Sequence, residues 1–502
     1  MQILSQSENI KSEYCASVVR IGELKPVPNS DFLAFTYINE KSIVVRKDMV
    51  KSGDLMFYAE NETELNPKFL GVNNLYEATE FQRNANSKEI ANAMSELAKA
   101  KKNEDAESIA KWDSFIKENT GFFTKQSRVR MIRLRGVASQ GFLFSKECMV
   151  KYCKDVEKLN LEDYVGKDFD TVNGELFIKD YVPQVQESRN KRRNTPNIPK
   201  KSRFDKVIDG QLRKHYDTNP FGKNKHLFFP DTKISVSTKV HGTSAIFANV
   251  LTNRLKAFVT PFGWLTDLVN KIHRHLPHKF QKIEKVYDVL YSSRKVILNQ
   301  YVDLSGKVEF TPTDKWHEYY ELLKDYIPQG MTLYGEIFGY ETGLSKMIQK
   351  NYDYGCEVGK NKFMPYRITM TNANGKPTEW EVSEVREWTL KLMKEHPEIA
   401  DRIFPIDILY EGTIENLYPN LDKSDIEKWQ EQILGLMSNE KRWSMEKKEP
   451  LCNNKVPREG VVIRIIGDPV AEAFKLKTVA FAEKERDLID KGEIDVEMME
   501  NL

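Results

Sequence analysis

Strict period-two alternation of apolar and polar residues recurs in the second half of the chain, and it is the feature that most constrains the fold. In ISVSTKVHG the alternation divides the side chains between two faces of a strand. One face holds Ile234, Val236, Thr238 and Val240, and the other holds Ser235, Ser237, Lys239 and His241. Because a strand of this kind packs one face on a core, Lys239 is expected to point away from the apolar layer and to be exposed.

Gly242 follows this strand directly. A glycine here lets the chain turn sharply and brings backbone N–H groups close to a ligand, an arrangement suited to phosphate. The tetrapeptide KVHG is weak evidence by itself, since a lysine at a strand end is usually only a solvated charge.

Three further strands place charged side chains beside apolar ones. Glu336 lies in LYGEIFG on the face opposite its apolar neighbours, and Glu459 precedes the apolar strand of EGVVIR. In AFKLKT the alternation puts Lys475 and Lys477 on one face. Two lysines side by side repel each other unless an anion lies between them, so the pattern indicates a phosphate clamp.

The segments KVHG, LYGEIFG, FMPYRIT, EGVVIR and FKLK occur in this order between residues 239 and 477. Their order resembles that of the covalent nucleotidyltransferases, the superfamily of polynucleotide ligases and mRNA capping enzymes. The resemblance implies that Lys239 attacks a nucleotide, with ATP as the donor and Mg²⁺ or Mn²⁺ as the metal. An amine with a pKa of about 10.4 attacks phosphorus only after losing its proton, so the site must disfavour the ammonium form.

The same resemblance implies a role for each remaining site residue. Glu336 would contact the ribose, and Glu459 would support the metal directly or through water, with Glu336 as a second candidate for the metal. Tyr366 would stack on the base, although an ordinary core aromatic is the alternative. The residues expected to bind the nucleotide are His241, Gly242, Arg294, Glu336 and Tyr366, and those expected to be catalytic are Lys239, Glu459, Lys475 and Lys477. A long insertion precedes Arg294, so another arginine or lysine is the alternative for its role.

His241 points to one branch of the superfamily. Most members have KxDG, and a histidine there is similar to RNA ligases of phage and RNA-editing systems. In the given sequence, only FAEKERDLIDKGEIDVEMMENL follows the last of these segments, which is short for the additional barrel of capping enzymes and DNA ligases. The expected activity is therefore that of an ATP-dependent RNA ligase. It would join 3′-OH and 5′-phosphate ends, at nicks in RNA or RNA–DNA duplexes, through lysyl-AMP and adenylylated RNA. A capping-type guanylyltransferase and a non-catalytic nucleic-acid-binding protein are the alternatives.

The predicted fold class is α+β, in three parts. Residues 1–155 are expected to form an OB-like β-barrel with a helical insertion in SKEIANAMSELAKAKKNEDAESIAKWDSFIKE. Residues 156–230 would connect the parts through a basic linker, QVQESRNKRRNTPNIPKKSRFDK, which is either a solvated hinge or a phosphate contact. Residues 231–502 would form the nucleotidyltransferase domain, built of ATP-grasp-like antiparallel sheets with helices. Ser424 and Glu427 fit a capping box at the start of one helix.

RVRMIRLRG reads as a basic strand of the barrel, able to bind RNA or simply charged on its outer face. Plain alternation puts Arg128 and Arg130 on one face and Arg133 and Arg135 on the other. His273, His275 and His278 resemble a zinc site only superficially, and a solvated helix end is the expectation. No GxxxxGK(S/T) segment is present, so the RNA is expected to arrive already phosphorylated.

Net charge, hydropathy and cysteine placement indicate the expected partners and cellular compartment. A net charge of +2 requires any RNA surface to come from local clusters. No apolar run approaches a membrane span and no signal peptide starts the sequence, so no membrane partner is expected. The five cysteines are scattered without a CxxC pair, which favours a reducing cytoplasm, of a cell or of a phage-infected host. No obligate protein partner is evident.

Overall fold

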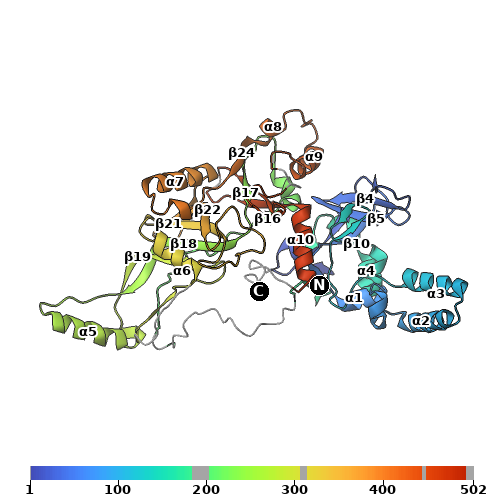
Figure 1. The fold of residues 1–502 in the computed structure, drawn as a ribbon, viewed down its shortest axis with the longest axis horizontal. Helices are drawn as coiled ribbons and strands as arrows, with labels where there is room; N and C mark the ends of the chain where they lie inside the picture. The colour runs from blue at the N-terminus through green and yellow to red at the C-terminus, as the bar shows by residue number, and fades with distance from the viewer. Residues whose placement is uncertain are drawn as a thin grey trace. The chain divides into compact units, whose positions relative to one another are not determined.

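The computed structural model describes residues 2–8, 10–183, 200, 203–305, 314–443, 448–467 and 469–492. The chain divides into two compact units, Met1–Pro183 and Gln184–Leu502 (Figure 1). The predicted boundary at residue 155 was too early. Strands at residues 168–180 pair with strands near the N-terminus, as Phe169 does with Ala16 and Ile178 with Leu65, so they belong to the first unit.

The N-terminal unit is a mixture of short strands and helices. Its strands are β1 (Leu4–Ser5), β2 (Ala16–Arg20), β3 (Lys25–Pro26), β4 (Leu33–Ile38), β5 (Lys41–Arg46), β6 (Leu55–Ala59), β7 (Thr63–Leu65), β8 (Ile132–Leu134), β9 (Val137–Ser139), β10 (Phe142–Phe144), β11 (Asp168–Phe169), β12 (Thr171–Val172), β13 (Glu175–Leu176) and β14 (Ile178–Asp180). Its helices are α1 (Pro67–Val72), α2 (Ser87–Lys102), α3 (Ala106–Asn119) and α4 (Lys146–Tyr152).

These strands form several small sheets, including the orders β10-β6-β2-β11 and β3-β4-β5. In the described part of the chain they do not close into a barrel, so the OB-like fold is not confirmed. Phenylalanines at 57, 69, 144, 169 and 177 pack in one aromatic core. The helical insertion is confirmed, but it is two helices. Glu104 has a φ of 55°, and the Asp105 side chain caps the second helix by accepting from the Ser108 N–H.

The C-terminal unit contains two five-stranded sheets and their helices. Its strands are β15 (Arg203–Asp205), β16 (Asn219–Pro220), β17 (Lys233–Lys239), β18 (Thr243–Leu255), β19 (Ile283–Ser292), β20 (Tyr301–Asp303), β21 (Met331–Gly339), β22 (Asn361–Thr371), β23 (Pro377–Glu379), β24 (Ile408–Thr413), β25 (Gly460–Ile465) and β26 (Ala473–Lys477). Its helices are α5 (Gly263–His275), α6 (Lys315–Leu323), α7 (Val382–Glu395), α8 (Ile414–Leu417), α9 (Ile426–Ser438) and α10 (Val479–Asp490).

One sheet has the order β16-β26-β25-β17-β24 and the other β19-β18-β21-β22-β23. The apolar side of the first packs on α9, where Val236, Ile463 and Phe474 meet Trp429 and Ile433. The second sheet packs its own apolar side on α6 and α7. The strand pairs of both sheets are antiparallel except β16 with β26, which is parallel, and the sheets with their helices agree with the expected α+β class. The chain passes from one sheet to the other through residues 240–242, between β17 and β18, which brings the polar ends of both sheets together.

Two local predictions in this unit were wrong. Helix α9 is capped by Asp425, whose carboxylate accepts from the Lys428 N–H at 3.0 Å, whereas the Ser424 hydroxyl donates to Asp422. His273 is buried, and its Nε2 accepts from the Lys282 N–H at 2.7 Å, so it is a structural residue of the helix end. His275 is exposed as expected, and the His278 side chain lies outside the described residues.

The basic linker falls largely outside the described residues, which omit 184–199 and 201–202. Of its described basic residues, two are held by the C-terminal unit. The Arg203 guanidinium lies 4.2 Å from the centroid of the Tyr301 ring, and Lys206 Nζ lies 2.6 Å from an Asp288 oxygen. The predicted connecting segment therefore contributes its first part to the N-terminal unit and its last part to the C-terminal one.

Candidate active site

Lys239 is the last residue of β17 and lies on its polar face, as the alternation predicts. Its side chain is 17% exposed, so it is more enclosed than expected. Lys239 Nζ lies 2.5 Å from Oε1 of Glu459, a carboxylate with no exposed surface. An ion pair this enclosed holds the amine at a fixed point beside a negative charge.

Two rows of side chains cross the first sheet. The register places Lys239 opposite Gly460 and Gly460 opposite Lys477, and two residues further it places Ser237, Val462 and Lys475 in line. All three lysines therefore share one face across three strands. Gly460 is required between them, because a Cβ there would lie 2.1 Å from the Leu476 carbonyl oxygen. Because Gly460 of β25 has no side chain, none separates Lys239 on β17 from Lys477 on β26. We call Lys239, Lys475 and Lys477 the lysine row.

Lys477 contacts two side chains of α10, the helix that follows β26. Its Nζ lies 2.9 Å from Glu485 Oε1 and 5.2 Å from the centroid of the Phe481 ring, both on α10. Lys475 is half-buried on the same strand. The arrangement supplies the pair of cations that the sequence predicts, facing the side of the sheet that carries Lys239.

His241 is buried behind Lys239. Its ring contacts the rings of Tyr352 and Phe481 edge-on, at 5.0 Å each, and its Nδ1 lies 3.8 Å from Glu459 Oε2. Its backbone N–H donates to the Tyr354 hydroxyl at 2.7 Å. From this position the imidazole can orient Glu459, and its 3% exposure leaves little surface for contact with a nucleotide.

Gly242, like Gly460, lies too close to a neighbouring strand for a side chain to fit. A Cβ at this position would lie 2.4 Å from the Ile337 carbonyl oxygen and 2.7 Å from Glu336 Cγ, so only glycine fits. The Gln349 amide donates to the Gly242 carbonyl at 2.6 Å. Glu336 of β21 is therefore brought against the turn that follows Lys239.

Tyr366 lies at a β-bulge in β22. Tyr334 pairs with Arg367 and Gly335 with Pro365, which leaves Tyr366 as the extra residue. Burial, then the nearby charge of Glu336, raises the pKa of the Tyr366 phenol. The Tyr366 ring also packs against two clusters of buried apolar residues, so it is partly a core aromatic.

Arg294 follows the end of β19 and is 15% exposed. One of its Nη atoms lies 3.9 Å from Asp217 Oδ1, and its charge is among those that act on the Tyr366 phenol. The structure thus brings Arg294 into the neighbourhood of Tyr366 and Glu336 despite the long insertion before it.

A buried charge cluster beside Tyr366 was missed by sequence reasoning. Glu379 of β23 is 2.9 Å from Arg367 of β22 and 3.4 Å from Arg464 of β25, and so it joins the two sheets. Burial, then the charge of Arg367, lowers the pKa of Arg464 to about 9. The Arg464 guanidinium lies 6.0 Å from the centroid of the Tyr366 ring. An arginine inside each of two apolar strands was the available signal, since such a charge needs a buried partner.

The predicted basic strand of the N-terminal unit is shorter than expected, because β8 contains only Ile132–Leu134. Arg128 is buried, with an Nη atom 2.6 Å from Glu62 and its guanidinium 5.1 Å from the Tyr181 centroid, so it has a structural position. Arg130 is half-buried, whereas Arg133 and Arg135 are exposed in and beside a tight turn. The simple alternation therefore does not describe these four side chains.

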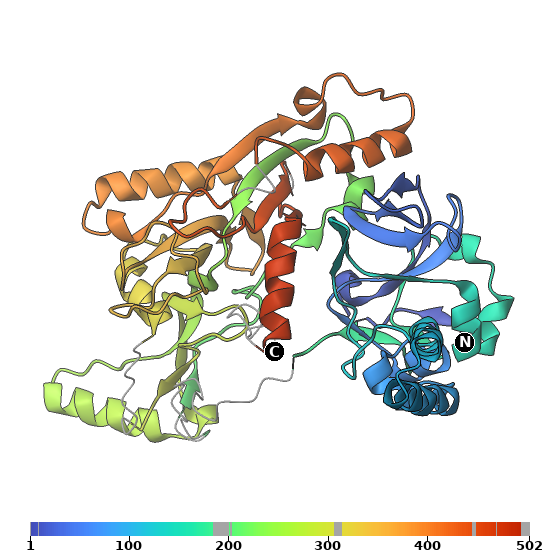
Figure 2. The ribbon, with the colours of Figure 1, turned by 45° about the vertical axis from the view of Figure 1, so that its right-hand side comes forward.

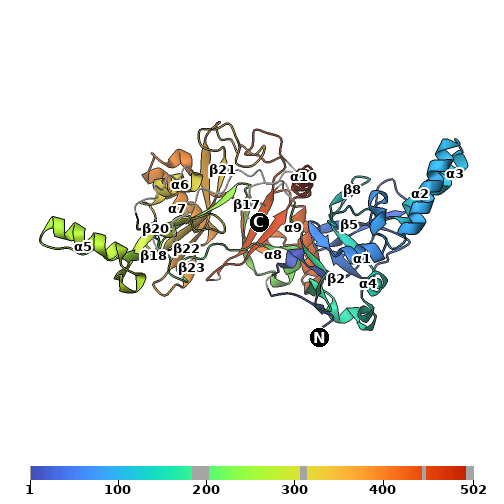
Figure 3. The same cartoon turned by 90° about the horizontal axis from the view of Figure 1, so that it is seen from below.

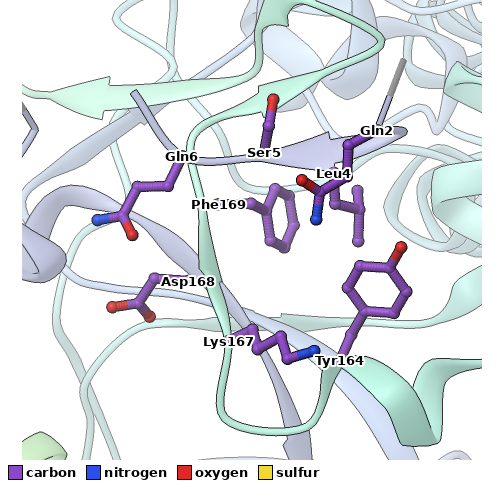
Figure 4. A pocket seen from close by; sticks show the side chains of 8 residues that line it. All are labelled: Gln2, Leu4, Ser5, Gln6, Tyr164, Lys167, Asp168 and Phe169. Carbon is purple, nitrogen blue, oxygen red and sulfur yellow. The ribbon is translucent and has the colours of Figure 1, made fainter. Parts of the chain in front are cut away.

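The N-terminal unit also has a shallow cavity of about 370 Å³ (Figure 4). Its lining side chains are those of Gln2, Leu4, Ser5, Gln6, Tyr164, Lys167, Asp168 and Phe169. Lys167 Nζ lies 5.5 Å from the Tyr164 centroid, and the Ser12 hydroxyl donates to Asp168. This mixed lining, with a carboxylate beside the lysine, does not match any predicted site.

Glu459 and Glu336 are the carboxylates that can hold a metal beside Lys239. Among the described residues, no three or more His, Cys, Asp or Glu side chains form a metal-binding group. Magnesium commonly takes one or two carboxylates and completes its shell with water and substrate phosphates, so two glutamates near an anion-binding lysine row fit such an ion.

None of the helices in the described ranges is long and apolar enough to cross a membrane.

Comparison with known proteins agrees with the motif order. Residues 232–477 match the family model of RNA ligases. A search of curated proteins finds no match. Among solved structures, a Naegleria gruberi RNA ligase variant with ATP and Mn has 14% sequence identity and a TM-score of 0.48, over 94% of this chain and 98% of the other. The same ligase with PPi has 14% identity and a TM-score of 0.47, over 94% and 99%. The segment matched by the RNA ligase family model, residues 232–477, contains Lys239, Glu336, Glu459 and both clamp lysines.

Proposed function

We propose that this chain is an ATP-dependent RNA ligase that acts through a lysyl-AMP intermediate. Lys239 Nζ, after losing its proton, attacks the α-phosphorus of ATP, and the bond to pyrophosphate breaks. The AMP is then transferred to the 5′-phosphate of an RNA, which releases the lysine. A 3′-hydroxyl attacks that activated phosphate, forms the phosphodiester and releases AMP.

The observation that carries this proposal is the row formed by Lys239, Gly460 and Lys477, with Glu459 2.5 Å from the Lys239 amine. A nucleophile and two cations on one face suit phosphoryl transfer, because the cations stabilise charge on the phosphate oxygens. Lys475 occupies the next position on the same face and would share this role.

The other residues position the nucleotide. Tyr366 would stack on the base, Glu336 would accept from the ribose, and Arg294 would contact a sugar or phosphate oxygen. His241 would orient Glu459 rather than touch the nucleotide, since it is buried behind the lysine. A bound Mg²⁺ or Mn²⁺ would supply charge neutralisation at the phosphates, with Glu459 and Glu336 as the residues able to hold it.

For the RNA, we propose 5′-phosphate and 3′-OH ends brought together at a nick, with RNA or DNA as the template strand, in a repair reaction. The N-terminal unit would contribute RNA contacts, for which Arg133 and Arg135 are the exposed candidates of the predicted set. An OB-like arrangement of its strands and a reducing cytoplasmic location remain proposals of the same kind.

The test is incubation with labelled ATP or GTP and Mn²⁺, followed by sealing of 5′-phosphorylated single-stranded and nicked RNAs. We expect a covalent adduct from ATP and a sealed nick, with both lost in Lys239→Ala. An adduct that forms only with GTP would identify a capping-type enzyme. RNA binding without any adduct would identify a non-catalytic protein.

A further inference from the structure

One surface of the C-terminal unit has no part in the proposed chemistry. We call it the α5 arm, residues 256–282, and it lies at the far end of the β18–β19 ribbon (Figures 1, 2 and 3). Its base is closed by the Lys256 N–H, which donates to the Lys282 carbonyl at 2.9 Å. Phe258 and Asn270 exchange two hydrogen bonds, at 2.8 and 3.0 Å, and the Phe258 ring packs on His273. The arm is therefore a folded element and not a loose loop.

The outer side of the arm exposes large apolar side chains. Trp264 is 69% exposed and Phe262 62%, and Phe280 is exposed as well. Along α5, Leu268 and Ile272 follow Trp264 at intervals of four, so they form one stripe on the helix. A folded element that exposes this much aromatic surface to water is typical of a binding site.

The α5 arm is also strongly basic. The arm contains five basic residues, Lys256, Lys271, Arg274, Lys279 and Lys282, against one acidic residue, Asp267. All five basic side chains are exposed. This gives the arm a net charge of +4 with histidine neutral, although the whole chain carries only +2. The arm is thus a local concentration of positive charge, which favours an anionic partner.

We infer that the α5 arm binds a single-stranded tail of the RNA substrate, an inference that rests on the proposed ligase function. The lysines and Arg274 would contact phosphates, and Trp264 and Phe262 would stack on unpaired bases. A basic helix with exposed aromatic and aliphatic side chains also suits an anionic membrane surface, but the place of the arm within the segment that matches RNA ligases favours RNA.

The position of the arm sets the length of RNA that can reach it. β18 begins beside Gly242 at the candidate site and has 13 residues before the arm. At about 3.3 Å per residue, this places the arm about 40 Å from Lys239 along the strand. Only an RNA that extends that far beyond the joined ends can contact both places.

The test compares 5′-phosphorylated nicked duplexes with and without a single-stranded tail of about 20 nucleotides, a length chosen to exceed the 40 Å span at about 3.4 Å per nucleotide. Binding is followed by fluorescence anisotropy over a salt series. The stacking variant is Trp264→Ala with Phe262→Ala, and the charge variant replaces Lys271, Arg274 and Lys279 with Gln. The matched control is Lys391→Gln with Lys394→Gln on α7, two exposed lysines outside the arm.

The stacking variant is expected to weaken binding of the tailed RNA about 30-fold or more and to leave the tail-less duplex unchanged. The charge variant is expected to make the slope of log K against log salt shallower by about 2, since each lost single-strand phosphate contact removes about 0.7. Formation of lysyl-AMP, which needs no RNA, should be normal in every variant. Its failure in the wild type would refute the ligase function separately.

Equal binding of the tailed RNA by wild type and both variants would overturn the inference. So would an equal loss with both RNAs, because that would place the arm's contacts near the junction. Trp264-dependent binding to anionic phospholipid vesicles, or Trp264-dependent self-association, with unchanged affinity for the tailed RNA, would assign the arm to a different partner.

Discussion

Replacing Glu459 by Gln removes the negative charge beside the proposed nucleophile while keeping the side-chain shape. At the observed 2.5 Å, and with an effective dielectric constant of about 20, the attraction between Glu459 and Lys239 is about 7 kcal/mol. Most of this offsets the cost of removing both groups from water. Breaking one partner of such a buried pair generally costs about 3–5 kcal/mol in folding stability, and the amide oxygen of Gln, which can still accept from the lysine, should reduce that to about 1–3 kcal/mol.

The effect on chemistry should exceed the effect on stability. Glu459 fixes the position of the Lys239 amine and is one of the two carboxylates able to hold the metal, so Glu459→Gln should slow lysyl-AMP formation about 10²- to 10³-fold, the range found when one electrostatic group of an active site is lost. The assay is single-turnover labelling with ATP and Mn²⁺, with chemical denaturation as the measure of stability. Glu318→Gln, which breaks a 2.8 Å ion pair with Arg402 elsewhere in the unit, is the matched control and should label normally. Labelling of Glu459→Gln at the wild-type rate would refute the assignment.

Three further changes test neighbouring parts of the site. Gly460→Ala should destabilise the C-terminal unit by at least about 1–3 kcal/mol in chemical denaturation, because its Cβ would lie 2.1 Å from a carbonyl oxygen; unchanged stability would contradict the close approach. Lys477→Gln should slow single-turnover labelling about 10²-fold or more, whereas unchanged labelling would remove it from the phosphate clamp. Burial opposes the charge on Asp353, but N–H donors from Asn453, Gly355 and Asn454 outweigh it and hold the pKa of that carboxyl below its usual value. The contribution of the Asp353 carboxylate to the free energy of unfolding should therefore be complete above about pH 4 and be lost as the pH falls through its lower, folded-state pKa. Asp353→Asn should remove this part of the pH dependence. A stability–pH curve that is unaltered in the variant would refute the role of Asp353.

The strand alternation predicted the polar face of β17 and β26 correctly because side chains of a strand alternate whatever the strand packs against. It could not predict that Lys239 would be enclosed, since enclosure depends on Glu459, which is 220 residues away in the sequence. The Tyr366 bulge had a readable signal in Pro365, because proline inside a central strand indicates a break in the ladder.

The N-terminal unit was harder to read because its strands are two to six residues long. Segments this short carry too little alternation to fix their pairing, and β11 and β12 pair with β2 and β1, which lie about 150 residues earlier in the sequence. The basic strand failed for a related reason. Alternation assigns faces but not burial, and Arg128 is buried because Glu62 and Tyr181 surround it.

The proposed function depends on a single covalent bond, between Lys239 Nζ and the phosphorus of AMP. Its most direct measurement is peptide mass spectrometry of the wild-type protein after incubation with ATP and Mn²⁺. The mass of one AMP is expected on the peptide that contains Lys239 and on no other lysine. An unmodified Lys239 peptide under these conditions, or AMP attached to a different lysine, would contradict it.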